Sequence, residues 1–437
     1  MGYALAFRRD PLRVFTYAAR TAGPVARIRI GPTVLYLVTK PAQIQQIFTD
    51  AAGQFGRSRF VAAFGRRLFG QAVSMLEGET WIERRQLVRP AVEARRMAGL
   101  APVVTDSVVR IMDSWRKDGE RVLDGDIMRM SVTGLGRILC GVDIDAHATE
   151  LAAGARQALS GLSERLRLGI PVPAWVPVRR FRDLATGTDR MRRVVDRIVD
   201  EKSAMPLADD YLSILLRHQR SEASLTGSAI REDLAIEVGI GGHQIATALN
   251  WIVHCLANAP DADRRLDMEL RGTLGARSAT YDDLHDLSYT SGVVDEALRL
   301  YPPFYFIPRT ALESTTVAGI RLPKGATVAI SPWVTHRDPD LFEAADSFRP
   351  ERWSNRGSKE LPAFAYLPFG GGARACIAAR LVRTFLIVAT ATLFQRCRFE
   401  AIRGVSVTPV AKTSLVMSQP LRVRVERRTC GIPRSVP

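Results

Sequence analysis

One short stretch, LPFGGGARACIAARL at residues 367–381, constrains this chain more than any other. A glycine-rich loop there delivers Cys376 directly before an apolar helical pattern, where the helix dipole and free N–H groups favour a thiolate. The glycines let the backbone approach a flat ligand closely, and Arg374 can meet an anionic group on that ligand. Together these features describe a loop on the proximal side of a haem.

The spacing F-x-x-G-x-R-x-C in this loop resembles the haem-binding signature of the cytochrome P-450 superfamily. Its members here are Phe369, Gly372, Arg374 and Cys376. The resemblance implies that Cys376 is the catalytic iron ligand and that the cofactor is haem b (iron protoporphyrin IX). One residue departs from the pattern, since the family usually has glycine two residues after the cysteine and this chain has Ala378. We expect the extra methyl group to be tolerated.

Other segments follow in the family's order and cover nearly the whole chain. They are GETWIERRQLVRPAV at 78–92, EALR at 296–299, YPPFYFIPRTA at 301–311, THRDPDLF at 335–342 and FRPERW at 348–353. The resemblance implies that Trp81, Arg85 and Arg309 bind the haem propionates with Arg374. It also implies a buried structural network, with no catalytic role, in which Glu296 and Arg299 lie one turn apart and Arg352 completes the set.

The hydrophobic pattern predicts a mostly α fold with a smaller β portion. Residues 25–39 alternate around a Gly-Pro pair and predict a hairpin, and residues 41–300 are mostly helical. Short β-rich segments follow after 300, with a further apolar helix at 377–394. No linker or repeat divides the chain, so we expect one cytochrome P450 domain over 1–437, with its haem-thiolate loop at 367–377.

The longest predicted helix, at about 230–257, resembles the family's distal helix, which crosses the haem face where oxygen and substrate meet. Within it, GIGGHQIATALNW at 239–251 contains three glycines, although glycine in a helix interior costs about 1 kcal/mol against alanine. We expect Gly241 and Gly242 to open a groove toward the haem. Gly241 and Ile245 are expected on one helix face, at i and i+4.

The distal helix lacks the family's acid followed by threonine, which together deliver protons to iron-bound dioxygen. Gln244 and Ile245 occupy these positions. An amide does not ionise, and isoleucine has no hydrogen-bond donor. Thr247 lies about 200° around the helix from Ile245 and does not replace it. His243 is adjacent in sequence but on another face.

Three functions remain open for such a protein. The first is oxygen-dependent monooxygenation in which a substrate hydroxyl or an ordered water replaces the missing donor. The second is redox-neutral, peroxide-dependent or N–O-dependent chemistry without dioxygen, such as rearrangement, cyclisation or nitrene-type transfer. The third is haem binding without turnover, as in a sensor or scaffold.

The segments expected to line the substrate pocket are apolar and aromatic, which favours a hydrophobic natural product of terpenoid, prenylated aromatic or fatty-acid type. The expected lining residues are Phe60, Phe64, Phe69, Phe304, Tyr305, Phe306, Leu415, Val416 and Met417.

The net charge of +16 favours an acidic partner. The basic residues do not form a nucleic-acid recognition motif, so no nucleic-acid partner is expected. If dioxygen is used, we expect an acidic ferredoxin-type electron donor that docks on the cysteine side of the haem, where Arg380 and Arg383 are candidate contacts.

No apolar run reaches the roughly 18–20 residues of a membrane span, and the N-terminus does not resemble a signal peptide, so we expect a cytoplasmic protein without an anchor. The five cysteines lack paired spacing, which argues against disulfides and a zinc site.

Overall fold

The structure is a computed structural model that describes residues 2–31, 33–50, 53–59, 70–115, 118–168, 179–222, 225–354 and 361–428. Most of these residues are helical, and short strands form small sheets, which confirms the predicted mostly α class with a smaller β portion. None of the helices in these ranges is both long and apolar enough to cross a membrane.

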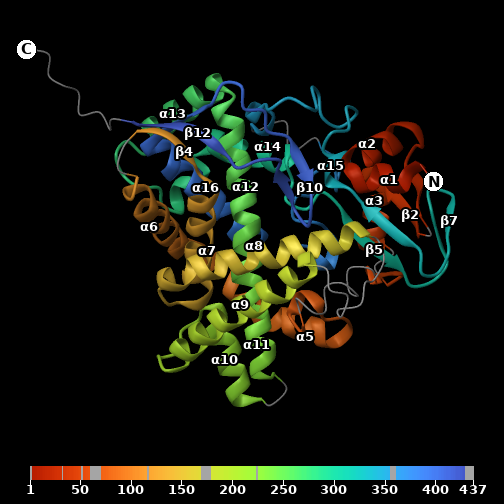
Figure 1. Cartoon of the computed structure of the whole chain (residues 1–437), viewed down its shortest axis with the longest axis horizontal. Helices are drawn as coiled ribbons and strands as arrows, with labels where there is room; N and C mark the ends of the chain where they lie inside the picture. Colours follow the sequence, from red (N-terminus) through yellow and green to blue (C-terminus); the bar gives the residue numbers. More distant parts are fainter. Residues whose placement is uncertain are drawn as a thin grey trace, which may run out of the picture.

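The α-helices surround a central long helix (Figure 1). Their bounds are α1 Gly2–Arg9, α2 Pro11–Thr21, α3 Pro41–Gln45, α5 Gly78–Val88, α6 Leu100–Asp113, α7 Asp124–Cys140, α8 Asp145–Leu168, α9 Arg179–Ser203, α10 Tyr211–Ser221, α11 Gly227–Leu234, α12 Gly241–Ala257, α13 Pro260–Thr273, α14 Ser288–Leu300, α15 Pro332–Thr335 and α16 Ala379–Arg396. Two π-helical segments are η1 Gln46–Asp50 and η5 Ala235–Ile240. Short 3-10 turns are η2 Val73–Met75, η3 Arg89–Val92, η4 Ala94–Gly99, η6 Asp282–His285, η7 Pro350–Trp353 and η9 Gly372–Arg374.

Within the described ranges, the strands form one mixed sheet and three smaller antiparallel ones. The largest has the order β1-β2-β8-β5-β3, in which β2 and β8 are parallel. The others pair β4-β12-β9, β10-β11 and β6-β7. The strand bounds are β1 Val25–Ile30, β2 Thr33–Val38, β3 Phe55–Arg57, β4 Gly119–Val122, β5 Ile307–Ala311, β6 Thr315–Val317, β7 Ile320–Leu322, β8 Thr327–Ile330, β9 Cys397–Ala401, β10 Pro409–Ala411, β11 Leu415–Met417 and β12 Arg422–Arg427. The predicted hairpin at 25–39 is the β1–β2 pair.

The predicted distal helix is one continuous helical element made of α11, η5 and α12. It begins at Thr226, whose side chain accepts a hydrogen bond from the Ala229 N–H at 3.2 Å, a standard N-cap. The π-helical segment η5 lies directly before Gly241, and such segments are frequent at functional sites. The element runs through the middle of the molecule, with the N-terminal helices and large sheet at one side (Figure 1).

Two of the three glycines in this element allow close helix packing. A Cβ on Gly239 would lie 2.8 Å from the Met191 Cε of α9, and one on Gly242 would lie 2.8 Å from the Val132 Cγ2 of α7. The sequence suggested that Gly242 opens a groove toward the haem, but the structure places it against α7 instead. Gly242 lets α12 approach α7 inside the main core, which contains α6, α7, α12 and α16.

Candidate functional site

A cavity of about 460 Å³ lies between the distal helix and the loop that carries Cys376. We call it the Cys376 cavity. Of the residues expected at the site, the cavity is lined by Cys376, Phe369, Arg374, Trp81, Arg85, Arg309, Gly241 and Gln244. These residues come from segments nearly 300 positions apart, so the fold brings together most of the site that the motifs indicate.

Backbone hydrogen bonds hold Cys376 at the start of α16. Its N–H donates to the Phe369 carbonyl at 2.9 Å, and its own carbonyl accepts from the Ala379 N–H at 3.3 Å. Desolvation, with the nearby Glu237 charge, raises the pKa of the Cys376 thiol to about 11 against the effects of the Ala378 N–H and Arg85, although the residue is exposed. The expected thiolate stays a prediction. Coordination to a metal ion favours it, because a coordinating thiol loses its proton.

Ala378 fits the place where the family usually has glycine. It is the N-cap residue of α16, and its backbone has φ −92° and ψ 14°, which any L-residue can adopt. Its side chain packs against the main core and borders the Cys376 cavity.

The glycine-rich loop is shaped by Phe48 of η1 and by Phe364. A Cβ on Gly371 would lie 2.6 Å from the Phe364 ring and 2.8 Å from the Phe48 ring, and Gly372 has φ +67° with its Cβ position against the Phe48 carbonyl oxygen. Gly372 is not among the residues that line the cavity, whereas Phe369 and Gly370 are. We infer that Gly372 shapes the loop, and its predicted contact with the cofactor stays a prediction.

Four arginines line one part of the cavity. They are Arg57, Arg85, Arg309 and Arg374. None of the described residues that line this part of the cavity is acidic. Burial, together with the neighbouring Arg374 and Arg57, lowers the pKa of Arg309 to about 10. Burial lowers the pKa of Arg374 as well, the Arg85 charge adds to that shift, and the nearby Glu77 charge opposes it for both Arg374 and Arg57.

This cluster fits the two propionates of a haem, since buried like charges need anionic partners. Trp81 organises it, because the guanidinium carbons of Arg374 and Arg85 lie 4.3 and 5.5 Å from its ring centroid. Sequence reasoning missed Arg57. The only signal for it is the long-range pairing of β3 with β5, which places Arg57 opposite Arg309.

The distal wall of the cavity differs from the expected one. Gly241, Gln244 and Ala248 line it, whereas Ile245 is 1% exposed and packs in the main core. Gln244 and Ile245 are about 100° apart on an α-helix, and in this structure only Gln244 of the two lines the cavity. The Gln244 Nε2 donates to the Ser414 Oγ at 2.9 Å, while its buried Oε1 has no partner among the described residues.

A carboxyl group on the same wall was not predicted. Glu237 lies in η5, lines the cavity and makes no hydrogen bond or ion pair with any residue that the structure describes. Burial, with a smaller effect of the Asp233 charge, raises its pKa to about 7. The sequence signal would have been an acid within an apolar helix, four residues before Gly241.

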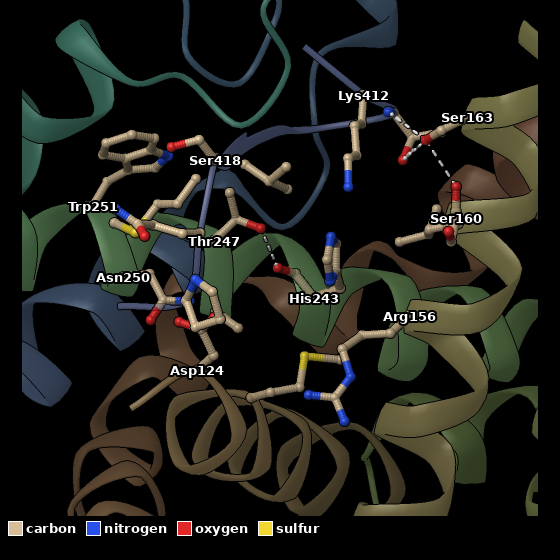
Figure 2. Close-up of a pocket in the computed structure, with 18 residues that line it drawn as sticks. Asp124, Arg156, Ser160, Ser163, His243, Thr247, Asn250, Trp251, Lys412 and Ser418 are labelled. Atoms are coloured by element: carbon tan, nitrogen blue, oxygen red, sulfur yellow. Dashed lines mark hydrogen bonds between the residues drawn. The ribbon is translucent and has the colours of Figure 1, made fainter. Parts of the chain in front are cut away.

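A second pocket, of about 370 Å³, lies on the other side of α12 (Figure 2). His243 and Thr247 line it, joined by a hydrogen bond from the Thr247 Oγ1 to the His243 carbonyl at 2.8 Å. Neither residue lines the Cys376 cavity, as expected from their places on the helix. Burial and the nearby charges of Arg156 and Lys412 lower the pKa of His243 to about 4. His243 is thus neutral at physiological pH.

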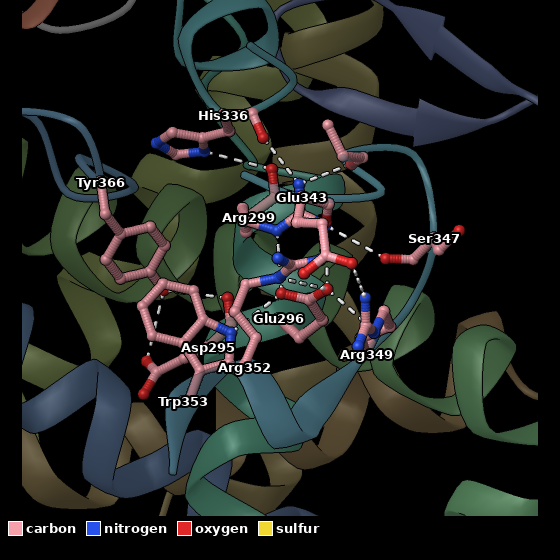
Figure 3. A network of polar contacts seen from close by, with 11 residues as sticks. Asp295, Glu296, Arg299, His336, Glu343, Ser347, Arg349, Arg352, Trp353 and Tyr366 are labelled. Atoms are coloured by element: carbon pink, nitrogen blue, oxygen red, sulfur yellow. Dashed lines mark hydrogen bonds and ion pairs between the residues drawn. The ribbon is translucent and has the colours of Figure 1, made fainter. Parts of the chain in front are cut away.

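The Glu296–Arg299 pair forms a buried network (Figure 3). The Arg299 Nε and Nη2 each donate to a Glu296 carboxylate oxygen at 2.8 Å, and Arg352 reaches Glu296 at 3.3 Å. Trp353, which sequence reasoning missed, donates from its Nε1 to Glu296 at 2.9 Å. The network ties α14 to η7 and to the backbone carbonyls of His336 and Ala345, so its role is structural.

The expected substrate-lining residues divide among three places. Phe304 and Phe306 line the Cys376 cavity. Val416 and Met417 line the second pocket, while Tyr305 and Leu415 are buried in a separate cluster beneath β1 and β2. Phe60, Phe64 and Phe69 lie outside the described residues.

Comparison with known proteins gives a consistent family. The family model described as Cytochrome P450 matches residues 1–427. "Cyclooctatin synthase" of Streptomyces melanosporofaciens is 31% identical over 98% of this chain and 94% of that protein. "Cyclooctat-9-en-7-ol 5-monooxygenase" of the same organism is 28% identical over 92% and 88% of the two chains. "Pentalenene oxygenase" of Streptomyces avermitilis is 28% identical over 99% and 96%.

Proposed function

The chain belongs to the cytochrome P450 family of haem-thiolate monooxygenases, and from this premise we propose that it oxidises a terpenoid-type hydrophobic natural product with dioxygen. The observation that carries the proposal is the Cys376 cavity, which is lined by one cysteine, a cluster of arginines and apolar residues such as Phe304, Phe306 and Ala248. The bacterial relatives that tailor terpenoids support the substrate class. We also propose that residues 1–437 form a single domain.

Haem b is the proposed cofactor. Cys376 would hold its iron, and Arg85, Arg309 and Arg374 would hold its propionates beside Trp81. When bound, haem b would supply the iron at which dioxygen is activated for insertion into a C–H bond. Phe304, Phe306 and Ala248 give the substrate an apolar surface and exclude water.

We propose that protons are delivered without the acid and threonine that the family usually has. Ile245 is in the core, and the Gln244 amide holds no transferable proton at neutral pH. Gln244 lines the cavity, and in this proposal its amide group orients a water or a substrate hydroxyl there. Such a water or hydroxyl then passes on the proton.

Electrons would come from a separate acidic ferredoxin-type protein. Arg380 is exposed at the start of α16, close in sequence to Cys376, and suits such a partner. Arg383 is less suited, because its guanidinium already donates to Asp295 at 2.6 and 3.0 Å.

The proposal is tested by comparing reductant consumed with peroxide released. The purified haem protein would be supplied with a surrogate ferredoxin and reductase and with a terpenoid that shifts the haem spectrum. Oxygenated product with little peroxide supports the proposal. Near-complete diversion to peroxide, with turnover of peroxides or N–O substrates in the absence of oxygen, supports the dioxygen-independent chemistry instead. A haem that binds ligands but turns over neither would indicate a non-catalytic protein.

A further inference from the structure

Tyr211 lines the Cys376 cavity and carries a buried hydroxyl group without a hydrogen-bond partner among the described residues. The residue is 3% exposed. Its position is fixed by Asp210, which caps α10 through the Ser213 N–H at 2.9 Å and pairs with Lys202 at 3.0 Å. Burial holds the pKa of the phenol well above its usual value, so the O–H remains available as a donor.

Glu237 presents a second unpartnered group to the same cavity. Its neighbour Asp233 is already satisfied, since it accepts from the Val73 N–H and from the Arg84 Nη1 at 3.0 Å. Glu237 has no hydrogen-bonded cation among the described residues, and the like charge of Asp233 helps to raise its pKa. It lies close enough to Tyr211 and to Cys376 that its charge contributes to raising the pKa of each.

Tyr211 and Glu237 line the same cavity, most of whose exposed lining is apolar. We propose that they form a polar subsite that binds a hydroxyl group of the substrate, which makes the substrate a hydroxylated terpenoid rather than a bare hydrocarbon. The inference deepens the proposed function and rests on it.

One hydroxyl group satisfies both partners at once. Its O–H donates to the Glu237 carboxylate, and its oxygen accepts from the Tyr211 O–H. A protonated Glu237 also pairs with an alcohol, as a donor, so recognition does not depend on the charge of the carboxyl group. A hydrocarbon would leave the buried Tyr211 hydroxyl and the half-buried Glu237 carboxyl group without partners, which is unfavourable. An ammonium group would have to lose its full hydration in an apolar cavity.

A hydroxylated substrate also sets the place of this enzyme in a reaction sequence. The alcohol must come from an earlier reaction, either hydroxylation of a terpene or capture of water during terpene cyclisation. The present enzyme then oxidises a C–H bond elsewhere on the same skeleton, while the existing hydroxyl group fixes the orientation of the molecule.

The test measures binding to the ferric haem protein through the spectral shift of the haem, without turnover. The probes are two matched pairs, cedrol with cedrane and abietadienol with abietadiene. We expect the wild-type protein to bind at least one alcohol about tenfold more tightly than its hydrocarbon, the effect of roughly one hydrogen bond. Tyr211→Phe and Glu237→Leu should each reduce that ratio to near one. Glu237→Gln should retain most of it, because an amide still hydrogen-bonds a hydroxyl group.

The matched control is Glu83→Leu, which makes the same change at an exposed position on α5 and should keep the wild-type ratio. Equal affinities within each pair for the wild-type protein would overturn the subsite. So would a preference that survives in both Tyr211→Phe and Glu237→Leu, or one that Glu237→Gln abolishes. If haem is incorporated but neither pair shifts its spectrum, the proposed terpenoid substrate is wrong, and the subsite falls with it.

Discussion

Gln244 on the distal helix and Ser414 beside the β10–β11 hairpin are joined by a 2.9 Å hydrogen bond from the amide Nε2 to the hydroxyl oxygen. Ser414 is 0% exposed, so this contact holds the amide in one orientation, with its oxygen buried and unpartnered. The distal position that usually carries an acid is therefore used here to attach α12 to the C-terminal part of the chain.

Restoring the usual acid and threonine should separate their two roles. Gln244→Glu places a carboxyl group at the cavity and should raise the fraction of reductant recovered in product if dioxygen is used. Ile245→Thr should add nothing to this coupling, because the side chain lies in the core, and should lower the free energy of unfolding by about 1–3 kcal/mol by burying a hydroxyl group. Product and peroxide yields, with urea unfolding, measure both effects. A coupling gain that requires Ile245→Thr would contradict this placement.

The buried Glu296–Arg299 pair should be far more important for stability than a neighbouring surface pair. Arg299→Leu leaves the Glu296 carboxylate, 0% exposed, without its bidentate partner, and should lower the free energy of unfolding by about 3–5 kcal/mol. Arg349→Leu is the control. It removes a pair with the exposed Glu343 and should cost less than about 1 kcal/mol, because solvent screens it. Guanidinium unfolding of both variants checks the difference, and equal losses would exclude a dominant role for the buried pair.

His336 should make stability depend on acid pH. Burial lowers its pKa from 6.5 to about 3, and its Nε2 accepts from the Leu367 N–H at 2.9 Å. The unfolded chain therefore binds a proton between pH 6.5 and 3 that the folded protein does not. The stabilisation is complete above pH 6.5 and decreases by about 1.4 kcal/mol per pH unit below it.

The measurement for His336 is the free energy of unfolding against pH, in the wild-type protein and in His336→Gln. The variant should have a smaller slope between pH 6.5 and 4, because glutamine does not titrate. Parallel slopes would show that His336 is not responsible, leaving groups such as His243, whose pKa burial lowers to about 4.

The loop motif and the flanking arginines were predictable because each depends on residues close in sequence. F-x-x-G-x-R-x-C fixes Cys376 and Arg374 relative to α16, and the Trp81–Arg85 pair lies on one turn of α5. The predicted helix at 377–394 is α16, at Ala379–Arg396, and the distal helix runs from Gly227 to Ala257. Periodicity is enough for such long elements.

Long-range contacts explain what the sequence did not reveal. Arg57 reaches the cavity through strand register, and Gly372 is positioned by Phe48, more than 300 residues away. Glu237 lies in a π-helical segment, where hydrogen bonds span one more residue than in an α-helix. The α-helical period therefore does not predict which side of the helix Glu237 lies on. Tyr211 comes from α10, which no motif connects with the site.

Arg380 provides a test of electron delivery. Arg380→Glu reverses an exposed charge at the start of α16 and should slow reduction of the haem by an acidic ferredoxin several-fold, with the deficit shrinking at high salt. Arg217→Glu, exposed on α10 and well separated from α16 in Figure 1, is the control and should have little effect. Stopped-flow reduction under carbon monoxide at two salt concentrations measures this. Equal effects of both variants would show that the rate of reduction depends on the net charge of the protein and not on a docking surface around Arg380.

Arg309 should affect haem retention and apoprotein stability in opposite directions. With haem bound, Arg309→Leu removes a charge-assisted contact to a propionate and should speed haem loss about ten- to hundredfold. Without haem, the same change removes a buried cation that Arg57 and Arg374 repel, so the apoprotein should be equally stable or more stable. Arg321→Leu, exposed on β7, should change neither quantity. Haem transfer to apomyoglobin and urea unfolding of the apoprotein test the pair of expectations. Unchanged haem loss, or a destabilised apoprotein, would mean that Arg309 serves the fold and not the cofactor.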